Sequence, residues 1–143
     1  HTLSLSYSCS HSSSLSRSTF LLEVVRRQSE LSLRDLKATT VRPAGAEGLA
    51  QACGAFDEPR FVAGVVSLPP GAMKDEEGVQ TCSQVFIIRQ GQLSSVEFTV
   101  NKEIFLLGGG DYFFVPPHNT YALRNHSKTV TAEISFVVMR PGS

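Results

Sequence analysis

The chain has 143 residues, enough for one domain with a hydrophobic core and too few for two. Hydrophobic residues make up 41% of it and charged residues 18%, and no apolar run approaches the roughly 20 residues that cross a bilayer. The 13 basic residues equal the 13 acidic ones, which removes the electrostatic case for nucleic acid as the main partner.

The beginning of the chain differs in composition from the rest. Residues 1–19 are rich in serine, a composition that favours disorder. Apolar residues at alternate positions in the same stretch favour an edge strand instead, and these are Leu3, Leu5, Tyr7 and Cys9. Both interpretations stay open. The apolar residues of 20–37 fit neither the helix period nor the strand period, so a short helix or a bent strand is expected. We predict an N-terminal extension at 1–35, packed on or near a single domain at 36–143. Because the chain begins with His1 and not Met, we expect it to be part of a longer protein.

From residue 38 onward, short runs rich in Val, Ile, Phe and Tyr are separated by Pro and Gly, a pattern typical of a β-sandwich or barrel. Residues 43–59 contain three glycines and are expected to form a long loop. The charged run at 74–77 is expected to be a solvated loop, with a partner-facing acidic loop as the alternative. The predicted strands are Ala38–Arg42, Phe61–Leu68, Gln84–Arg89, Leu93–Val100, Glu103–Leu107, Tyr112–Val115, Thr120–Asn125 and Thr129–Met139.

The segment from Gly110 to Asn125 has the most informative spacing. Gly110 opens a predicted strand, Pro116 closes it because proline cannot donate to a ladder, and Asn125 ends the next strand. This spacing resembles the second motif of the cupin superfamily, and Gly71 and Gly91 match the ends of the first cupin motif. The resemblance implies an all-β, cupin-type jelly-roll barrel.

The positions of the cupin metal ligands carry other residues here. Gln84 stands where metal-binding cupins have a glutamate, and Tyr121 stands where they have the histidine of the second motif. A transition metal needs three or four converging imidazole, carboxylate or thiolate groups, so this is a poor ligand set. His118 and His126 are expected to be surface turn residues. We therefore predict no metal, no cofactor and no catalytic residue, and a protein that is not an enzyme.

The chain also resembles a narrower family, the C-terminal cupin of centromere protein C, most specifically in its second half. The run FVPPHNTYALRN at 114–125 follows that family's second motif, with His118 in place of its usual glycine. A turn glycine often marks a positive φ, which His tolerates better than a β-branched residue does, so we expect the turn to be kept. The resemblance covers roughly Leu36 to Arg140.

This resemblance implies a non-catalytic homodimerising module at the end of an inner kinetochore scaffold, in the nucleus at the centromere. Dimerisation would let the scaffold bind centromeric nucleosomes bivalently. The implied partners are a second copy of the chain and a chaperone or loading factor for the centromeric histone variant. Direct contact with nucleic acid or a membrane is not expected of this domain.

Strand parity identifies candidate interface residues. If Gln84 faces the barrel interior, Phe86 and Ile88 also face in, whereas Val85 and Ile87 face out. Outward apolar residues in mid-strand indicate cover by the extension or by a second subunit. The last strand, at 133–139, is apolar on both faces, which is typical of a strand buried on both faces. The predicted interface residues are Val85, Ile87, Phe136 and Val137.

An alternative function is a metal-independent, small-molecule-binding or enzymatic cupin that uses the barrel mouth as a pocket. Its candidate residues are Gln84, Phe86 and Tyr121. An open polar barrel would favour this alternative. A barrel plugged by Phe86, Ile88 and Tyr121 would favour the scaffold, and the size of these side chains favours the plug.

Overall fold

The structure, a computed structural model, describes residues 24–36 and 45–142. No helix in these ranges is long or apolar enough to cross a membrane. Within the described residues, a 3-10 helix, η1 (Gln28–Glu30), precedes ten strands. In chain order these are β1 (Arg34–Asp35), β2 (Gln51–Asp57), β3 (Phe61–Leu68), β4 (Met73–Gly78), β5 (Ser83–Gln90), β6 (Val96–Val100), β7 (Glu103–Leu107), β8 (Tyr112–Val115), β9 (Thr120–Asn125) and β10 (Ala132–Met139).

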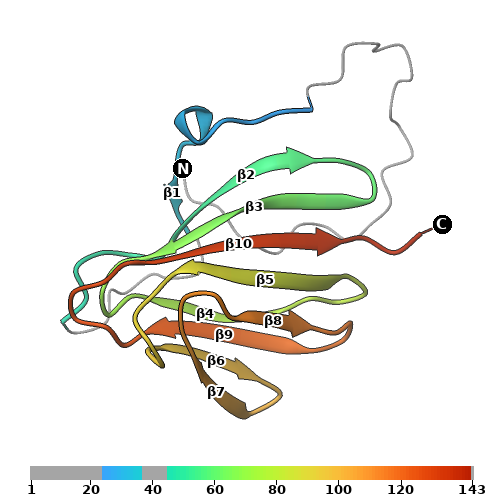
Figure 1. The fold of residues 1–143 in the computed structure, drawn as a ribbon. Helices are drawn as coiled ribbons and strands as arrows, with labels where there is room; N and C mark the ends of the chain where they lie inside the picture. The colour runs from blue at the N-terminus through green and yellow to red at the C-terminus, as the bar shows by residue number, and fades with distance from the viewer. Residues whose placement is uncertain (1–23, 37–44, 143) are drawn as a thin grey trace.

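The strands form two antiparallel sheets that enclose one core (Figure 1). The six-stranded sheet has the order β1-β2-β3-β10-β5-β8, and the four-stranded sheet has the order β4-β9-β6-β7. Chain neighbours such as β4 and β5 lie in different sheets, which is the connectivity of a jelly roll. The predicted all-β jelly-roll class is therefore confirmed.

The strand predictions are correct where side chains alternate or where Pro and Gly bound a short apolar run. β3, β7, β8 and β9 have the predicted bounds, and β5, β6 and β10 differ from them at their ends. Strand β6 begins only at Val96, because Ser95 N–H bonds to the Gln92 carbonyl in a turn. The predicted strand Ala38–Arg42 lies outside the described residues.

Two predicted loops are wrong. Residues 43–59 contain β2, which pairs along β3 with a bulge between Gly54 and Phe56. Gly54 lies at that bulge, and glycine inside a strand often marks a bulge and not a loop. The charged run at 74–77 lies in β4, which pairs with β9. There the pairing partner decides the structure, because acidic residues have low intrinsic strand propensity.

Alternation along the strands fills the space between the sheets with apolar side chains. In β5 the residues Gln84, Phe86 and Ile88 are buried, whereas Val85 and Ile87 are half-buried and face outward, as predicted. In β10 the buried residues alternate with more exposed ones along the whole strand. The interior is thus a packed core and the outward rows are separate from it.

The turn that joins β8 to β9 keeps the expected conformation. His118 has φ 66°, in the left-handed region, and its N–H bonds to the carbonyl of Gln80. A residue with a Cβ in this region costs about 1 kcal/mol relative to glycine. The structure thus confirms the prediction that His118 occupies a turn that glycine would suit.

We expect His118→Gly to raise the free energy of unfolding by about 0.5–1 kcal/mol, because glycine adopts this φ without a Cβ clash. Chemical unfolding of both proteins measures the difference. His118→Ala is the matched control, since it removes the imidazole but keeps the Cβ. A gain of the same size with alanine would show that the imidazole, and not the backbone, is responsible.

Candidate functional site

The barrel interior holds the two residues at the cupin ligand positions. Gln84 on β5 and Tyr121 on β9 belong to facing sheets, and both are almost fully buried. The Phe86 ring lies 5.3 Å from the Tyr121 ring, measured between centroids. Burial raises the pKa of Tyr121 well above its usual value, so its phenol stays neutral and is not an anionic ligand.

Aromatic rings fill the rest of this space. Phe86 stacks on Phe113 with ring centroids 4.5 Å apart, and Phe98 lies 4.4 Å from Phe113. Phe86, Ile88 and Tyr121 have almost no accessible surface. The predicted plug is confirmed, and the structure gives the alternative pocket of Gln84, Phe86 and Tyr121 no opening to solvent at these side chains.

A buried lysine lies beside these residues, and no sequence pattern predicted its burial. Lys74 on β4 is 1% exposed, and its Nζ lies 4.3 Å from the centre of the Tyr121 ring. It lies 3.5 Å from Glu77 Oε1, and it is paired across the sheet with the buried Leu123. Burial lowers the pKa of Lys74, while the Glu77 carboxylate opposes that shift.

These side chains do not fit a transition metal. The neutral amide of Gln84 and the neutral phenol of Tyr121 are weak donors, and the Lys74 ammonium against the Tyr121 ring would repel a cation. In residues 24–36 and 45–142, no three His, Cys, Asp or Glu residues are placed to share a metal ion. The barrel histidines lie outside the core, since His118 is in an exposed turn and His126 Nε2 is 2.8 Å from Glu97 Oε1 at the surface.

The outward rows of the six-stranded sheet bring together most of the predicted interface residues. Val85 pairs with Val137 on one side and with Phe114 on the other. Ile87 lies in the next outward row, opposite Ser135 and Tyr112. We call this surface the outer apolar face; its apolar members are Phe61, Val65, Val85, Ile87, Tyr112, Phe114, Val137 and Met139.

One predicted interface residue does not belong to this face. Phe136 is 2% exposed and its ring lies 6.3 Å from that of Phe86, inside the barrel. Its neighbour Val137 is 37% exposed and points outward. The run of apolar residues in β10 hid this alternation from sequence reasoning, because both faces of the strand carry large apolar side chains. We therefore leave Phe136 out of the proposed interface.

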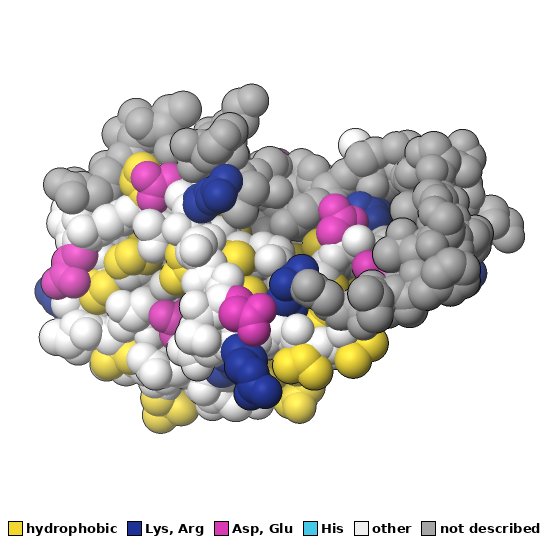
Figure 2. Space-filling view, turned by 90° about the horizontal axis from the view of Figure 1, so that it is seen from above, with side chains coloured by type: hydrophobic (Ala, Val, Ile, Leu, Met, Phe, Trp, Pro, Cys, Tyr) yellow, Lys and Arg dark blue, Asp and Glu magenta, His cyan; other side chains and the backbone are white. Residues whose placement is uncertain are grey.

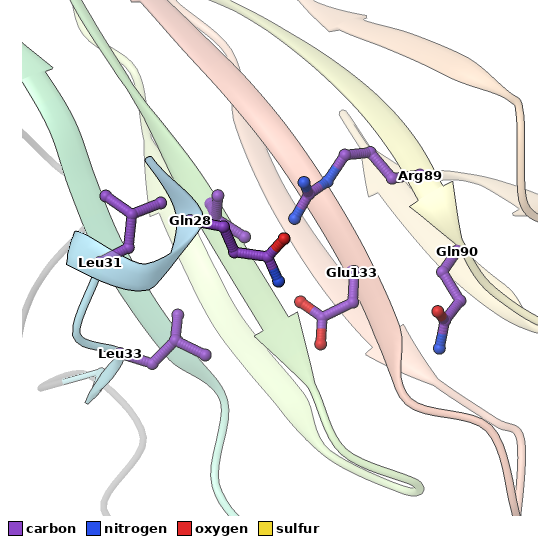
Figure 3. Close-up of a pocket in the computed structure, with 7 residues that line it drawn as sticks. Gln28, Leu31, Leu33, Arg89, Gln90 and Glu133 are labelled. Carbon is purple, nitrogen blue, oxygen red and sulfur yellow. The ribbon is translucent and has the colours of Figure 1, made fainter. Parts of the chain in front are cut away.

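A cleft of about 450 Å³ adjoins the outer apolar face where the N-terminal segment crosses the sheet (Figure 3). Gln28 and Arg89 extend into it from opposite sides, and Glu133 lies between them. Arg26 Nε donates to the Ala55 carbonyl, which holds this segment against β2. The full lining is Gln28, Leu31, Leu33, Val65, Arg89, Gln90 and Glu133.

The view from above shows basic and acidic side chains interspersed, in keeping with the balanced charge (Figure 2).

A family model described as Mif2/CENP-C like matches residues 52–138. The chain belongs to this family. The inner kinetochore subunit cnp3 of Schizosaccharomyces pombe is 38% identical to this CENP-C-like domain over 72 residues, which are 50% of this chain and 11% of that protein. The solved cupin domain of Schizosaccharomyces pombe Cnp3 matches with a TM-score of 0.59 and 30% identity, over 64% of this chain and 65% of that one.

The CENP-C-like domain is thus a kinetochore cupin domain, nuclear and centromeric in location. A predicted oxalate decarboxylase from Thermotoga maritima also matches, with a TM-score of 0.68 over 82% of this chain and 99% of that one. At 16% identity this likeness shows the fold alone. The similar proteins within the family carry kinetochore names, and the enzyme name belongs to a distant neighbour of the fold.

Proposed function

We propose that this CENP-C-like domain is a non-catalytic homodimerisation and protein-docking module of an inner kinetochore scaffold. The observation that carries the proposal is the outer apolar face, where Phe61, Phe114, Val137 and Met139 are each more than a third exposed. An exposed apolar patch of this extent on a sheet is typical of a protein interface. Family membership supports the kinetochore setting.

A second copy of the chain is the occupant we propose for this face. The face is broad and carries few charges, so two copies related by a two-fold axis bury like against like. The half-buried Val85 and Ile87 lie in mid-face, where a stable interface places its best-buried apolar residues. Joining two scaffold chains in this way raises the effective concentration of their nucleosome-binding parts without any new contact to the nucleosome.

The docking partner in this proposal is a chaperone or loading factor that delivers the centromeric histone variant. The plugged barrel supports docking on an outer surface rather than ligand binding at the mouth. The alternative, a metal-independent cupin with a small-molecule pocket, would need the aromatic plug to move. Titration calorimetry with the purified loading factor tests the docking, and absence of heat at about 100 µM of each protein would contradict it, since typical specific interfaces bind more tightly.

Light scattering at several concentrations, with and without a chelator, tests the dimer. We expect twice the chain mass of 15.5 kDa, unchanged by the chelator. A monomer at every concentration would contradict dimerisation. A dimer that dissociates in the chelator would contradict our assignment of a metal-free barrel.

A further inference from the structure

A second apolar surface lies at the open side of the barrel, between β7 and β8. These strands each end one sheet, and neither has a second strand neighbour among the described residues. A groove of about 450 Å³ runs between them. Its lining residues are Phe98, Val100, Asn101, Glu103, Phe105, Leu107, Tyr112, Phe113, Phe114, Pro116 and Asn119.

The two strands line the groove in different ways. Strand β7 contributes alternate residues, Glu103, Phe105 and Leu107, so it turns one face of its side chains to the groove. Strand β8 contributes the consecutive residues 112–114, so it turns its backbone edge to the groove. That edge carries N–H and C=O groups that β5, on the other side of β8, does not use.

The floor and rim of the groove are aromatic. The rings of Phe98 and Phe113 lie 4.4 Å apart at its base, and Phe105 lies 6.1 Å from Phe98 with 44% of its surface exposed. Tyr112 and Phe114, on the outward face of β8, are also exposed. Proteins usually protect edge strands with charge or proline, so an edge flanked by open aromatic side chains is suited to receiving another strand.

We propose that this groove binds an extended segment of a partner protein, which adds to β8 as a further strand of the six-stranded sheet. Alternate side chains of the segment enter the groove onto Phe98, Phe105 and Phe113, and the others lie beside Tyr112 and Phe114. Glu103 is the only charged residue of the lining. The segment is therefore apolar on both faces, with a basic residue at the end that meets Glu103.

The size of the groove favours a segment over a second copy of the chain. Strand β8 has four residues, about 13 Å of pairing edge. A stable dimer buries about 800 Å² on each partner, far more than such an edge and groove offer. This inference rests on the proposed docking function, and it places the docked segment on the free edge of β8, the strand next to the one that carries Val85 and Ile87.

The test uses a fluorescein-labelled peptide, KVIVFT, with KVPVFT as its partner that cannot complete a strand. We expect KVIVFT to bind with a Kd of about 100 µM or tighter, and KVPVFT at least about tenfold more weakly, because proline removes a ladder hydrogen bond. Phe105→Glu is expected to weaken KVIVFT binding at least about tenfold. Ile104→Glu is the matched control, since Ile104 is 63% exposed on the opposite face of the same strand, and its binding is expected to be unchanged.

Amide hydrogen exchange with and without KVIVFT locates the added strand. We expect slower exchange at Tyr112 and Phe114, whose amides lie on the free edge. Absence of saturable binding up to about 1 mM, or equal binding by wild type and Phe105→Glu, overturns the inference. Light scattering on the wild type and on Phe105→Glu separates the two proposals, because a monomeric wild-type protein that still binds KVIVFT contradicts the dimer alone, whereas a dimeric wild type that does not bind it contradicts the groove alone.

Discussion

The double variant Val85→Glu/Ile87→Glu is expected to be a folded monomer. Both side chains point away from the core, so the isolated barrel tolerates the change. In a two-fold dimer the variant places four carboxylates in one interface, and each desolvated, unpaired charge costs several kcal/mol. We expect the dimer dissociation constant to rise at least about 1,000-fold, which corresponds to about 4 kcal/mol. Sedimentation equilibrium of wild type and variant measures this change.

Two further variants sharpen this prediction. Val137→Glu introduces a charge on the neighbouring strand at a site that is more exposed in the monomer, and it is expected to weaken the dimer as well. Leu93→Glu is the control, because Leu93 is 86% exposed and lies in the turn before β6. Circular dichroism and chemical unfolding confirm that each variant is folded. A folded Val85→Glu/Ile87→Glu dimer with unchanged affinity would contradict the outer apolar face as the interface.

Glu77→Gln is expected to lower the free energy of unfolding by about 3 kcal/mol at neutral pH. The change leaves the buried ammonium of Lys74 without its nearest opposing charge, and a buried charge without a partner is far more costly than a buried pair. Urea unfolding of the variant measures the loss. Glu76→Gln is the matched control, since Glu76 is exposed on the same strand, and we expect less than about 0.5 kcal/mol from it.

The pH dependence identifies Lys74 as the cause. Its pKa in the folded state is below the ordinary 10.5, so between those two values the unfolded chain holds a proton that the folded chain has released. Stability therefore rises with pH across that window, and removal of Glu77 extends the window downward. We expect the deficit of Glu77→Gln to shrink as the pH approaches 10. A deficit that is constant from pH 7 to 10 would contradict this assignment.

A paired replacement completes the argument. In Lys74→Met/Glu77→Leu the ion pair gives way to apolar side chains, a change that is often neutral or stabilising in buried sites. We expect this variant to recover most of the stability that Glu77→Gln loses. Failure to recover it, in a protein that still folds, would show that Glu77 acts through its shape and not its charge.

The class of fold could be predicted because two signals agree along most strands: the alternation of apolar and polar residues, and the Pro and Gly residues that separate the strands. In β5 both the inward Phe86 and the outward Val85 followed from strand parity, once the cupin resemblance had placed Gln84 inside the barrel. In β4, by contrast, a run with few apolar residues forms a strand because β9 pairs with it, and no local sequence pattern predicts that pairing. The same holds for the buried charge of Lys74, since a lysine next to acidic residues in the sequence is typical of a solvated loop. Only the pairing of β4 with β9 shows that its side chain is buried. Phe136 and Val137 could not be assigned to faces from sequence because both positions are apolar.

The groove between β7 and β8 was also beyond sequence reasoning. Its floor and walls come from three strands, β6, β7 and β8, and from the turns that follow β6 and β8, and only the sheet order shows that β7 and β8 are both edges. An unbroken apolar run such as residues 104–107 predicts a strand that is covered on both faces. The structure instead leaves Ile104 and Phe105 open on opposite faces.

The buried Lys74 changes what the barrel requires from the cell. In a cupin that holds a transition metal, the positive charge comes from the medium, and it is lost when the metal is chelated or scarce. In this chain the buried positive charge beside Tyr121 belongs to Lys74, which is part of the polypeptide. We therefore expect the folded fraction of this domain to be independent of metal supply, and in our proposal the amount of assembled scaffold depends on the concentration of the protein itself.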